Sequence, residues 1–470
     1  MEQAKAGTCT TATASEVGAS DVDDLHVVEI PTPRETVVAV PHPMPLSLAE
    51  EGIRRIQFVS AKQPVMTAIR DMYLASQPLK GRRVLLCSHL RLTTGFCALI
   101  LRDLGAQVMV CGSNKWSTRD DVVAALNAEP GIEAASRYGA PDHEFFGYLR
   151  AAIAWGPDLI ADDGAELLAM MHGMGADGNA VAVSPRPVRG VCEQTTSGVV
   201  RIREIQEAQS DKRLLAPAIG VNECKTKHLI DNRYGSGESC LTALICTTNC
   251  TLRGRVIVVV GYGHVGRGLA AQARGMGARV IVTERSPISG LEAHMEGFEV
   301  MRLAEAVKSA DFVITATGYA GAFGADAIAN VKDGAFLSNA GHTETEIDTK
   351  ALADAAVVIN KHVADNIDEY VLGSGNAQEG GPQRKVYLIA NGHTCNVATG
   401  RGHSADIIDI TFGLKLRSVL YLAEKAWPTA AHAKDAAPLE NKLQNLPAHL
   451  DASVARIALA SRGMQVDERN

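Results

Sequence analysis

A glycine-rich turn between two apolar segments constrains the fold of this chain more than any other feature. Residues 256–284 read VIVVVGYGHVGRGLAAQARGMGARVIVTE, in which Gly261, Gly263 and Gly266 fit the pattern G-x-G-x-x-G. The first glycine permits a tight turn after a strand, the second lets a pyrophosphate approach the backbone, and the third lets helix and strand pack closely. The pattern therefore predicts the β-α-β unit of a Rossmann domain, with a dinucleotide at the N-terminus of its helix.

The residue that ends the second strand of this unit bears on which dinucleotide binds. Glu284 follows the apolar segment 280–283, where a carboxylate can accept hydrogen bonds from the ribose hydroxyls of NAD. Arg285 comes next and could instead bind the 2′-phosphate of NADP, so the sequence favours NAD without excluding NADP. His264 and Val265, inside the fingerprint, are also expected to contact the cofactor.

Length and composition are typical of a soluble enzyme with more than one domain. The chain has 470 residues, more than one core usually supports, with 46% hydrophobic and 21% charged residues. A net charge of −7 provides no basic surface for nucleic acid or anionic membranes, and the sequence has neither a segment approaching a membrane span nor a secretion signal. Its ten cysteines lack metal-ligand spacing. We therefore expect a cytoplasmic protein with no metal, no disulfide and no nucleic-acid or membrane partner.

The pattern of apolar segments divides the chain into four parts and predicts an α/β fold class. Residues 1–45 are expected to form a flexible or extended arm, and 46–232 an α/β substrate-binding domain. Residues 233–395 are expected to form the Rossmann domain, after which an apolar-periodic helix, within about 400–427, packs back on the first domain. Residues 428–470 are predicted to be a C-terminal helical segment.

Polar side chains follow several of the predicted strands, where ligands bind in open α/β sheets. His89 follows RRVLLCS, Asp162 and Asp163 end or follow DLIA, and His342 follows AFLSNAG. A single residue of this kind is often a structural cap, but four such positions make these strand ends candidates for chemistry.

Two further segments have more than one interpretation on spacing alone. Thr195, Thr196 and Ser197 supply three consecutive hydroxyls that could bind phosphate or ribose, or could cap the following helix. Lys227 and Asp231 are four residues apart, so on a helix they would share a face and could form an ordinary surface pair.

From about residue 56 to the C-terminal region, the chain resembles the S-adenosylhomocysteine hydrolase family. The segments that carry the resemblance include KGRRVLLCSHL, SNKWSTRDD, ADDGAELL, GVCEQTTSGVVR, PAIGVNECKTKHLIDNRYGSGES, VVVGYGHVGRG, SNAGHTETEID and CNVATGRGHS. The resemblance implies a substrate domain, a Rossmann domain with tightly bound NAD, and a homo-oligomer, a tetramer or a dimer. It also implies transient oxidation of a nucleoside 3′-hydroxyl, which acidifies the 4′-proton so that the 5′ substituent can be eliminated.

The resemblance also suggests roles for individual residues. Lys227 and Asp231 match positions that act on the 3′-hydroxyl, and His89 and Asp163 match acid and base positions around the 4′ and 5′ atoms. The remaining matches are His342 and Asn232 beside the nicotinamide and substrate, His403 in a loop that closes over the base, and Thr195, Thr196, Ser197, Glu284, Asn339 and Asn396 as cofactor contacts.

The chain departs from the family pattern at substrate-recognition positions. Arg91 and Thr93 stand where a threonine and a glutamate usually contact the base and its surroundings. Gln194 replaces an acid that normally bonds the ribose, and Ser236 replaces a cysteine near the nicotinamide. The C-terminal segment is shortened and ends in GMQVDERN, without the family's tail that reaches the cofactor of a neighbouring protomer. Base and sugar recognition, and NAD retention or assembly, are therefore expected to differ.

Three functions are compatible with this pattern. Because the changes concentrate at substrate recognition, the sequence favours a nucleoside dehydratase, of the kind that would convert psicofuranine, an adenine nucleoside, into angustmycin A. The alternative is an S-adenosylhomocysteine hydrolase that gives adenosine and homocysteine. A catalytically inactive NAD-binding regulator is disfavoured, since it would not need His89, Asp163, Lys227 and Asp231 together.

Overall fold

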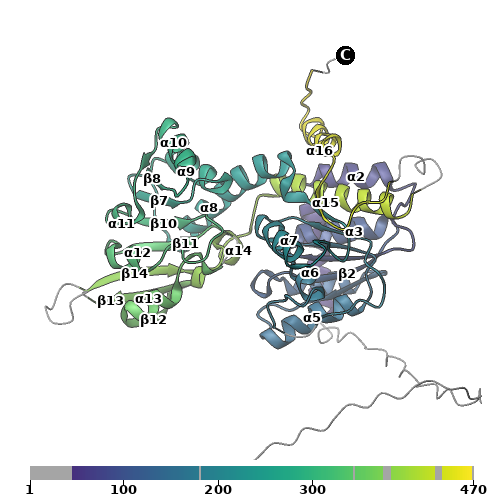
Figure 1. The fold of residues 1–470 in the computed structure, drawn as a ribbon, viewed down its shortest axis with the longest axis horizontal. Coiled ribbons are helices and arrows are strands. Elements are labelled where there is room, and N and C mark those ends of the chain that lie inside the picture. Colours follow the sequence, from purple (N-terminus) through teal and green to yellow (C-terminus); the bar gives the residue numbers. More distant parts are fainter. Residues whose placement is uncertain (1–44, 179–180, 342–343, 374–382, 429–436, 468–470) are drawn as a thin grey trace, which may run out of the picture. The chain divides into compact units, whose positions relative to one another are not determined.

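Two β-sheets with helices on both faces organise the chain in the computed structural model (Figure 1). The structure describes residues 45–178, 181–341, 344–373, 383–428 and 437–467. Nearly all of the predicted N-terminal arm, and the candidate residue His342, lie outside these residues. The two-sheet arrangement confirms the predicted α/β fold class.

The first sheet is parallel throughout, with strand order β15-β6-β5-β4-β1-β2-β3. Apart from the edge strand β15, its strands are nearly continuous buried segments, which is typical of parallel strands covered on both faces. They are β1 (Arg83–Ser88), β2 (Gln107–Gly112), β3 (Ile132–Ala135), β4 (Leu159–Asp162), β5 (Gly190–Glu193), β6 (Ala218–Gly220) and β15 (Leu443–Asn445).

Helices from distant parts of the sequence cover the two faces of this sheet. One face packs against α1 (Leu46–Ser60), α2 (Pro64–Tyr73), α3 (Leu92–Asp103), α4 (Asp120–Asn127), α15 (Ala405–Ala426) and α16 (Ala448–Ala460). The other packs against α5 (Asp142–Ala154), α6 (Glu166–Met171) and α7 (Thr196–Ala208). The apolar-periodic helix predicted after the Rossmann domain is α15, and its buried side chains belong to the core of the first sheet.

The C-terminal segment is not purely helical, so that prediction was incomplete. Besides α16, it contributes β15, which pairs in parallel with β6 at the edge of the first sheet, Leu443 opposite Ala218. A strand of three residues is too short to produce a detectable alternation of apolar side chains.

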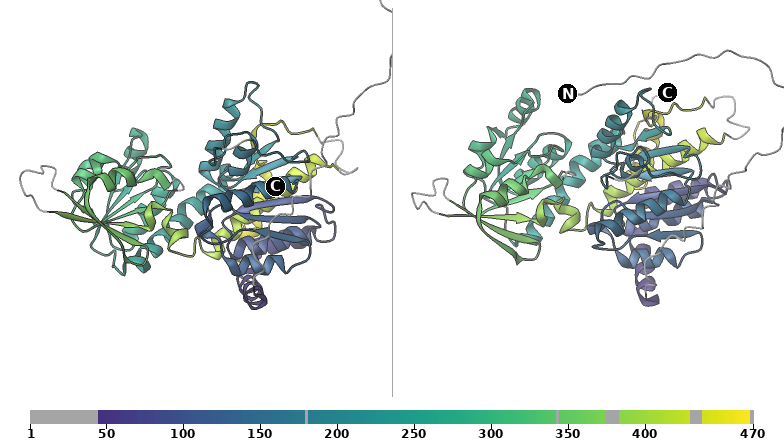
Figure 2. Two further views of the ribbon diagram at one scale, coloured as in Figure 1. Left: turned by 90° about the horizontal axis from the view of Figure 1, so that it is seen from below. Right: turned by 60° about the horizontal axis from the view of Figure 1, so that its bottom comes forward.

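The second sheet has the order β12-β13-β14-β11-β10-β7-β8-β9. Its parallel part comprises β7 (Val256–Val260), β8 (Arg279–Thr283), β9 (Glu299–Val300), β10 (Phe312–Thr315), β11 (Ala335–Asn339) and β14 (Arg384–Ile389). The sequence did not predict the antiparallel extension formed by β12 (Ala356–Ala364) and β13 (Ile367–Leu372). The faces carry α8 (Ser236–Thr248), α9 (His264–Gly275), α10 (Pro287–Met295), α11 (Leu303–Ala306), α12 (Ala325–Asn330) and α13 (Thr349–Ala355), visible in Figure 2 in the teal and green part of the chain.

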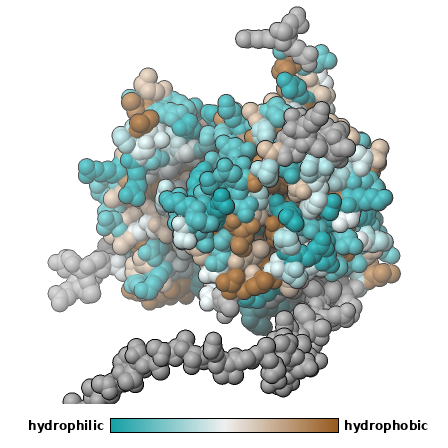
Figure 3. Space-filling view, turned by 45° about the vertical axis from the view of Figure 1, so that its right-hand side comes forward, coloured by the Kyte–Doolittle hydropathy of each residue, from teal (hydrophilic) through white to brown (hydrophobic). Residues whose placement is uncertain are grey.

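The face drawn in Figure 3 is largely hydrophilic, with smaller apolar areas. Within the described ranges, no helix combines the length and apolar character needed to cross a bilayer. Every cysteine in these ranges is a free thiol, and no group of side chains there has the composition of a metal site.

Candidate active site

The glycine fingerprint forms a turn from β7 into α9 that leaves room for a phosphate. Gly261 has a φ of +99°, which side-chain-bearing residues rarely adopt. A Cβ at Gly266 would lie 2.0 Å from the carbonyl oxygen of Gly261, so this position requires glycine for close packing. A Cβ at Gly263 would meet no protein atom within 4 Å, and open space therefore lies over this exposed residue. The turn fits the pyrophosphate of a dinucleotide.

Glu284 follows β8 beside the same turn and is held there by three backbone amides. Its carboxylate accepts hydrogen bonds from the amide of Tyr262 at 2.6 Å, that of Arg285 at 2.6 Å and that of Ser286 at 2.9 Å. This arrangement fixes an acceptor at the position where the Rossmann fold binds the cofactor ribose.

His264, at the start of α9, links the fingerprint to another candidate segment. Its ring stacks on that of His228, with centroids 4.6 Å apart, and burial together with His228 lowers the pKa of His264. Val265 beside it is half-buried. The fingerprint helix is thus in contact with the segment that carries Lys227.

Two asparagines expected to contact the cofactor are buried in the second sheet and its following loops. Asn339, at the end of β11, accepts hydrogen bonds from the Thr315 hydroxyl at 3.0 Å and the Gly341 amide at 2.8 Å. Asn396, in α14 (Cys395–Ala398), donates to the Ser239 hydroxyl at 2.8 Å. Its Oδ1 is buried and has no partner among the described residues, which leaves an acceptor available to a ligand.

The three hydroxyls of segment 195–197 lie at the N-terminus of α7, and each has a partner within the protein. Thr195 accepts from the Gly198 amide at 2.9 Å and donates to Glu193 at 2.7 Å, so it is a helix cap. Ser197 lies 3.3 Å from the Thr195 hydroxyl, and Thr196 donates to Asn222 at 3.1 Å.

Lys227 and Asp231 lie in a π-helical segment, η3 (Lys227–Gly235), and form a buried ion pair with a separation of 3.0 Å. Only 7% of the Lys227 side chain and 4% of the Asp231 side chain are exposed, which rules out an ordinary surface pair. The ammonium also donates to Asn232, whose amide nitrogen donates to the same Asn222 that binds Thr196. π-helical turns are rare in proteins, and those that occur are frequently found at functional sites.

Two residues from the end of the chain complete the surroundings of Asp231. The Thr411 hydroxyl donates to its carboxylate at 2.7 Å, and His403 Nδ1 lies 3.1 Å away. Burial alone would raise the pKa of Asp231, but Lys227 and His403 hold that pKa well below its usual range. Asp231 is therefore a carboxylate that orients a lysine, a histidine and a hydroxyl around one point.

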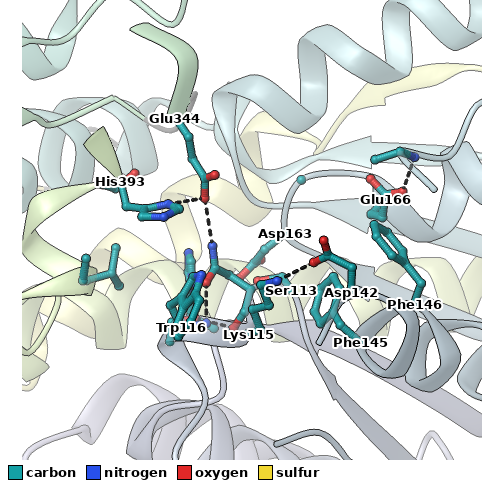
Figure 4. A pocket seen from close by; sticks show the side chains of 18 of the residues that line it. Ser113, Lys115, Trp116, Asp142, Phe145, Phe146, Asp163, Glu166, Glu344 and His393 are labelled. Atoms are coloured by element: carbon teal, nitrogen blue, oxygen red, sulfur yellow. Dashed lines mark hydrogen bonds and ion pairs between the residues drawn. The ribbon is translucent and has the colours of Figure 1, made fainter. Parts of the chain in front are cut away.

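A cavity of about 570 Å³ is lined by the other pair of candidate acid–base residues, His89 and Asp163. Figure 4 labels Asp163 among the side chains that line it. His89 Nδ1 lies 2.6 Å from the Ser117 hydroxyl. Trp116, Phe145, Phe146, Glu166, Glu344 and His393 are among the other side chains that line the cavity. Its volume and its mixed apolar and polar lining suit a small organic ligand.

Two of the residues that depart from the family pattern, Arg91 and Gln194, have buried polar atoms without partners among the described residues. Arg91 donates to the carbonyl of Val397 at 2.5 Å, but its buried Nε has no partner among the described residues. Thr93 accepts from the side chain of Gln63 at 2.8 Å. Gln194 is 9% exposed, and its buried Oε1 likewise lacks a partner there. Such orphaned groups are expected where a ligand supplies the missing hydrogen bond.

Several buried polar residues around Asp163 are not predicted by the sequence pattern. Lys415 on α15 donates to Asp163 and to Ser88, while Glu193 accepts from the backbone amides of Gly164 and Ala165. The available signal was a lysine within the apolar stripe of a helix, where a charged residue is almost never fully buried unless it is paired.

The fold and the site define a class: an α/β protein that combines a Rossmann dinucleotide-binding domain with a second α/β domain rich in buried acid–base groups. The model of the S-adenosyl-L-homocysteine hydrolase family matches residues 44–187, and that of the family's NAD-binding domain matches residues 232–402. The chain therefore belongs to this family, as an NAD-dependent enzyme.

Several curated relatives are similar along most of the chain. An adenosylhomocysteinase of Saccharolobus solfataricus is 39% identical, over 90% of this chain and 94% of the relative. The adenosylhomocysteinase of Aquifex aeolicus is 38% identical over the same shares, and that of Thermotoga maritima 39% over 89% and 96%. Among solved structures, a dipicolinate synthase chain of Bacillus halodurans has 16% identity and a TM-score of 0.37, covering 59% of this chain and 87% of its own.

Proposed function

We propose that this enzyme oxidises a sugar hydroxyl of an adenine-type nucleoside, eliminates the substituent at the terminal carbon and then reduces the ketone again. When bound, NAD supplies the reversible acceptance of a hydride that this sequence of steps requires. The observation that carries the proposal is the buried network of Lys227, Asp231 and Asn232. The neutral amine of Lys227 would take the hydroxyl proton, and the ammonium so formed, paired with Asp231, would return it when the ketone is reduced.

The cofactor would be held by the fingerprint turn, Glu284 and Asn396. We propose that it is NAD, tightly bound and recycled within each turnover. Asp163 and His89, which line one cavity, would take the proton from the carbon next to the ketone and protonate the leaving group. We also propose that the protein forms a homo-oligomer.

Hydrolysis of S-adenosylhomocysteine is the first specific candidate. Its support is the name adenosylhomocysteinase, carried by relatives 36% to 39% identical over about nine-tenths of the chain. The comparisons favour this reaction over the dehydration that the sequence departures suggest.

Dehydration of a nucleoside, as from psicofuranine to angustmycin A, is the second candidate. The specific observation in its favour is Gln194, buried with a free amide oxygen where the family pattern has an acid. An amide both donates and accepts, so it suits a sugar that carries a different set of hydroxyls. Arg91 and Thr93 stand at positions that the family resemblance assigns to base recognition, so we propose that the base subsite differs as well.

One experiment separates the candidates. NAD-loaded protein is incubated with S-adenosylhomocysteine, adenosine or psicofuranine in ordinary and in deuterated water, and the products are identified by mass spectrometry. Homocysteine release identifies the hydrolase, whereas loss of water from a nucleoside without homocysteine identifies the dehydratase. No product and no deuterium incorporation with any of the three would contradict the proposal and leave a regulatory homologue as the better explanation.

Lys227→Ala is the matched variant for the same assay. It should abolish turnover and deuterium incorporation while the protein still binds NAD, since the fingerprint turn is intact. Retained turnover would remove Lys227 from the proposed chemistry.

A further inference from the structure

Lys415 is a fully buried lysine whose ammonium group contacts one of the proposed catalytic residues. It lies on α15, is 1% exposed, and donates to Asp163 Oδ1 and to the Ser88 hydroxyl, each at 2.6 Å. Asp163 itself lines the cavity that also contains His89. Because Lys415 does not line that cavity, it acts on a ligand there only through Asp163.

Two further buried carboxyl groups lie next to the Lys415–Asp163 pair. Asp162 and Glu193 are both fully buried beside Asp163, and burial raises the pKa of Asp162 to about 7 and that of Glu193 to about 8. Burial alone would lower the pKa of Lys415, but Asp163 raises it above its ordinary value. Among the described residues, Cys87 on β1, Cys97 on α3 and Cys192 on β5 also interact electrostatically with the pair, and Glu166 on α6 interacts with Asp162.

A carboxyl group in such surroundings would take up a proton unless a cation stabilises its charge. A protonated Asp163 could not accept a proton from carbon. Lys415 supplies the cation, and Ser88, as its second acceptor, fixes the direction of the ammonium group. With Oδ1 bound to Lys415, Oδ2 has no hydrogen-bond partner within the described ranges and is the oxygen available to a substrate.

We propose that Lys415 is a positioning residue that keeps Asp163 ionised and selects Oδ2 as the proton acceptor. The inference rests on the proposed function. In the step concerned, the C–H proton next to the ketone moves to Oδ2, the C–H electron pair remains on the carbon and delocalises into the ketone as an enolate, and Asp163 becomes a neutral acid. Lys415 stays an ammonium throughout.

The test compares the wild type with Lys415→Met, Lys415→Gln and Ser88→Ala, with Lys308→Met as a control. Lys308 forms an exposed ion pair with Glu305. The first readout is the pH profile of deuterium exchange at the carbon next to the ketone. Both Lys415 variants should move its acidic limb upward by about 1–3 pH units, and Ser88→Ala by less, because a neighbouring cation lowers the pKa of a carboxyl group by that amount. NAD binding should not change, and Lys308→Met should match the wild type.

The second readout requires no substrate. Without Lys415, the buried Asp163 carboxylate has no counter-ion, so the stability of the variant should fall as pH rises from about 4 towards 7. The wild type should lack this added loss, and Asp163→Asn should remove it from the variant. Lys415→Gln, which can still hydrogen-bond, replaces Lys415→Met if the latter does not fold.

Parallel pH–stability curves for the wild type and the Lys415 variants would overturn the inference, as would an unchanged pH profile of exchange. If the wild type exchanges no proton with any nucleoside, the proposed function fails, while the stability curves still decide whether Lys415 keeps Asp163 ionised.

Discussion

The buried ion pair of Lys227 and Asp231 leads to a large predicted effect of a conservative change. Asp231→Asn removes the charge but keeps the size of the side chain, and so leaves the Lys227 ammonium, 7% exposed, without a counter-ion. Breaking a buried pair by removing one partner costs about 3–5 kcal/mol, whereas an exposed pair contributes about 0.2–1 kcal/mol. We expect a loss in the first range, enlarged by weaker hydrogen bonds from Thr411 and His403.

The assay is equilibrium urea unfolding of the NAD-saturated protein, followed by far-ultraviolet circular dichroism, for Asp231→Asn, Lys227→Met and the double variant. The double variant should be less destabilised than the sum of the two single variants, because it leaves no unpaired buried charge. Lys308→Met, from an exposed pair, is the control and should lose less than about 1 kcal/mol. A loss below about 1 kcal/mol for Asp231→Asn, or additive single effects, would refute the reasoning.

Three further predictions concern the cofactor turn and the buried acids. Gly263→Ala should leave the thermal stability of the cofactor-free protein unchanged but weaken NAD binding in calorimetry, because its Cβ enters the open space over the turn; Gly266→Ala should lower both, since its Cβ would lie 2.0 Å from a carbonyl oxygen. Glu284→Ser should raise the affinity for NADP relative to NAD, because it removes a carboxylate that would repel a 2′-phosphate, and an unchanged ratio in binding titrations would contradict this assignment. The pKa of Asp162 is raised to about 7 by burial, so its contribution to stability is present below the unfolded pKa of about 4 and is lost as pH rises to about 7; Asp162→Asn should flatten the pH dependence of the melting temperature in that window.

Part of the site could be predicted because local sequence encodes local geometry. The spacing of Gly261, Gly263 and Gly266 and the carboxylate of Glu284 belong to one continuous β-α-β unit, whose strands pair Val260 with Thr283. Spacing could not decide whether Lys227 and Asp231 form a surface pair, because that depends on Thr411 and His403, about 170 to 180 residues away.

Buried charges could be interpreted only in the folded chain. In the sequence, Lys415 is a single lysine within an apolar helical pattern. In the folded chain it contacts Asp163, 252 residues earlier, and Ser88, 327 residues earlier. The strand β15 was also not predicted, because three residues are too few to show the alternation of apolar side chains that predicts a strand.

The sequence by itself determined the fold class, the dinucleotide turn and membership in a family, because each is encoded in the order and spacing of neighbouring residues. Only the tertiary structure decided which charges are buried, which hydroxyls are already used and which polar atoms lack partners. Those properties depend on how α15 and the loops around residues 396–411 pack against segments far away in the sequence, and burial in turn sets the protonation state and strength of each group.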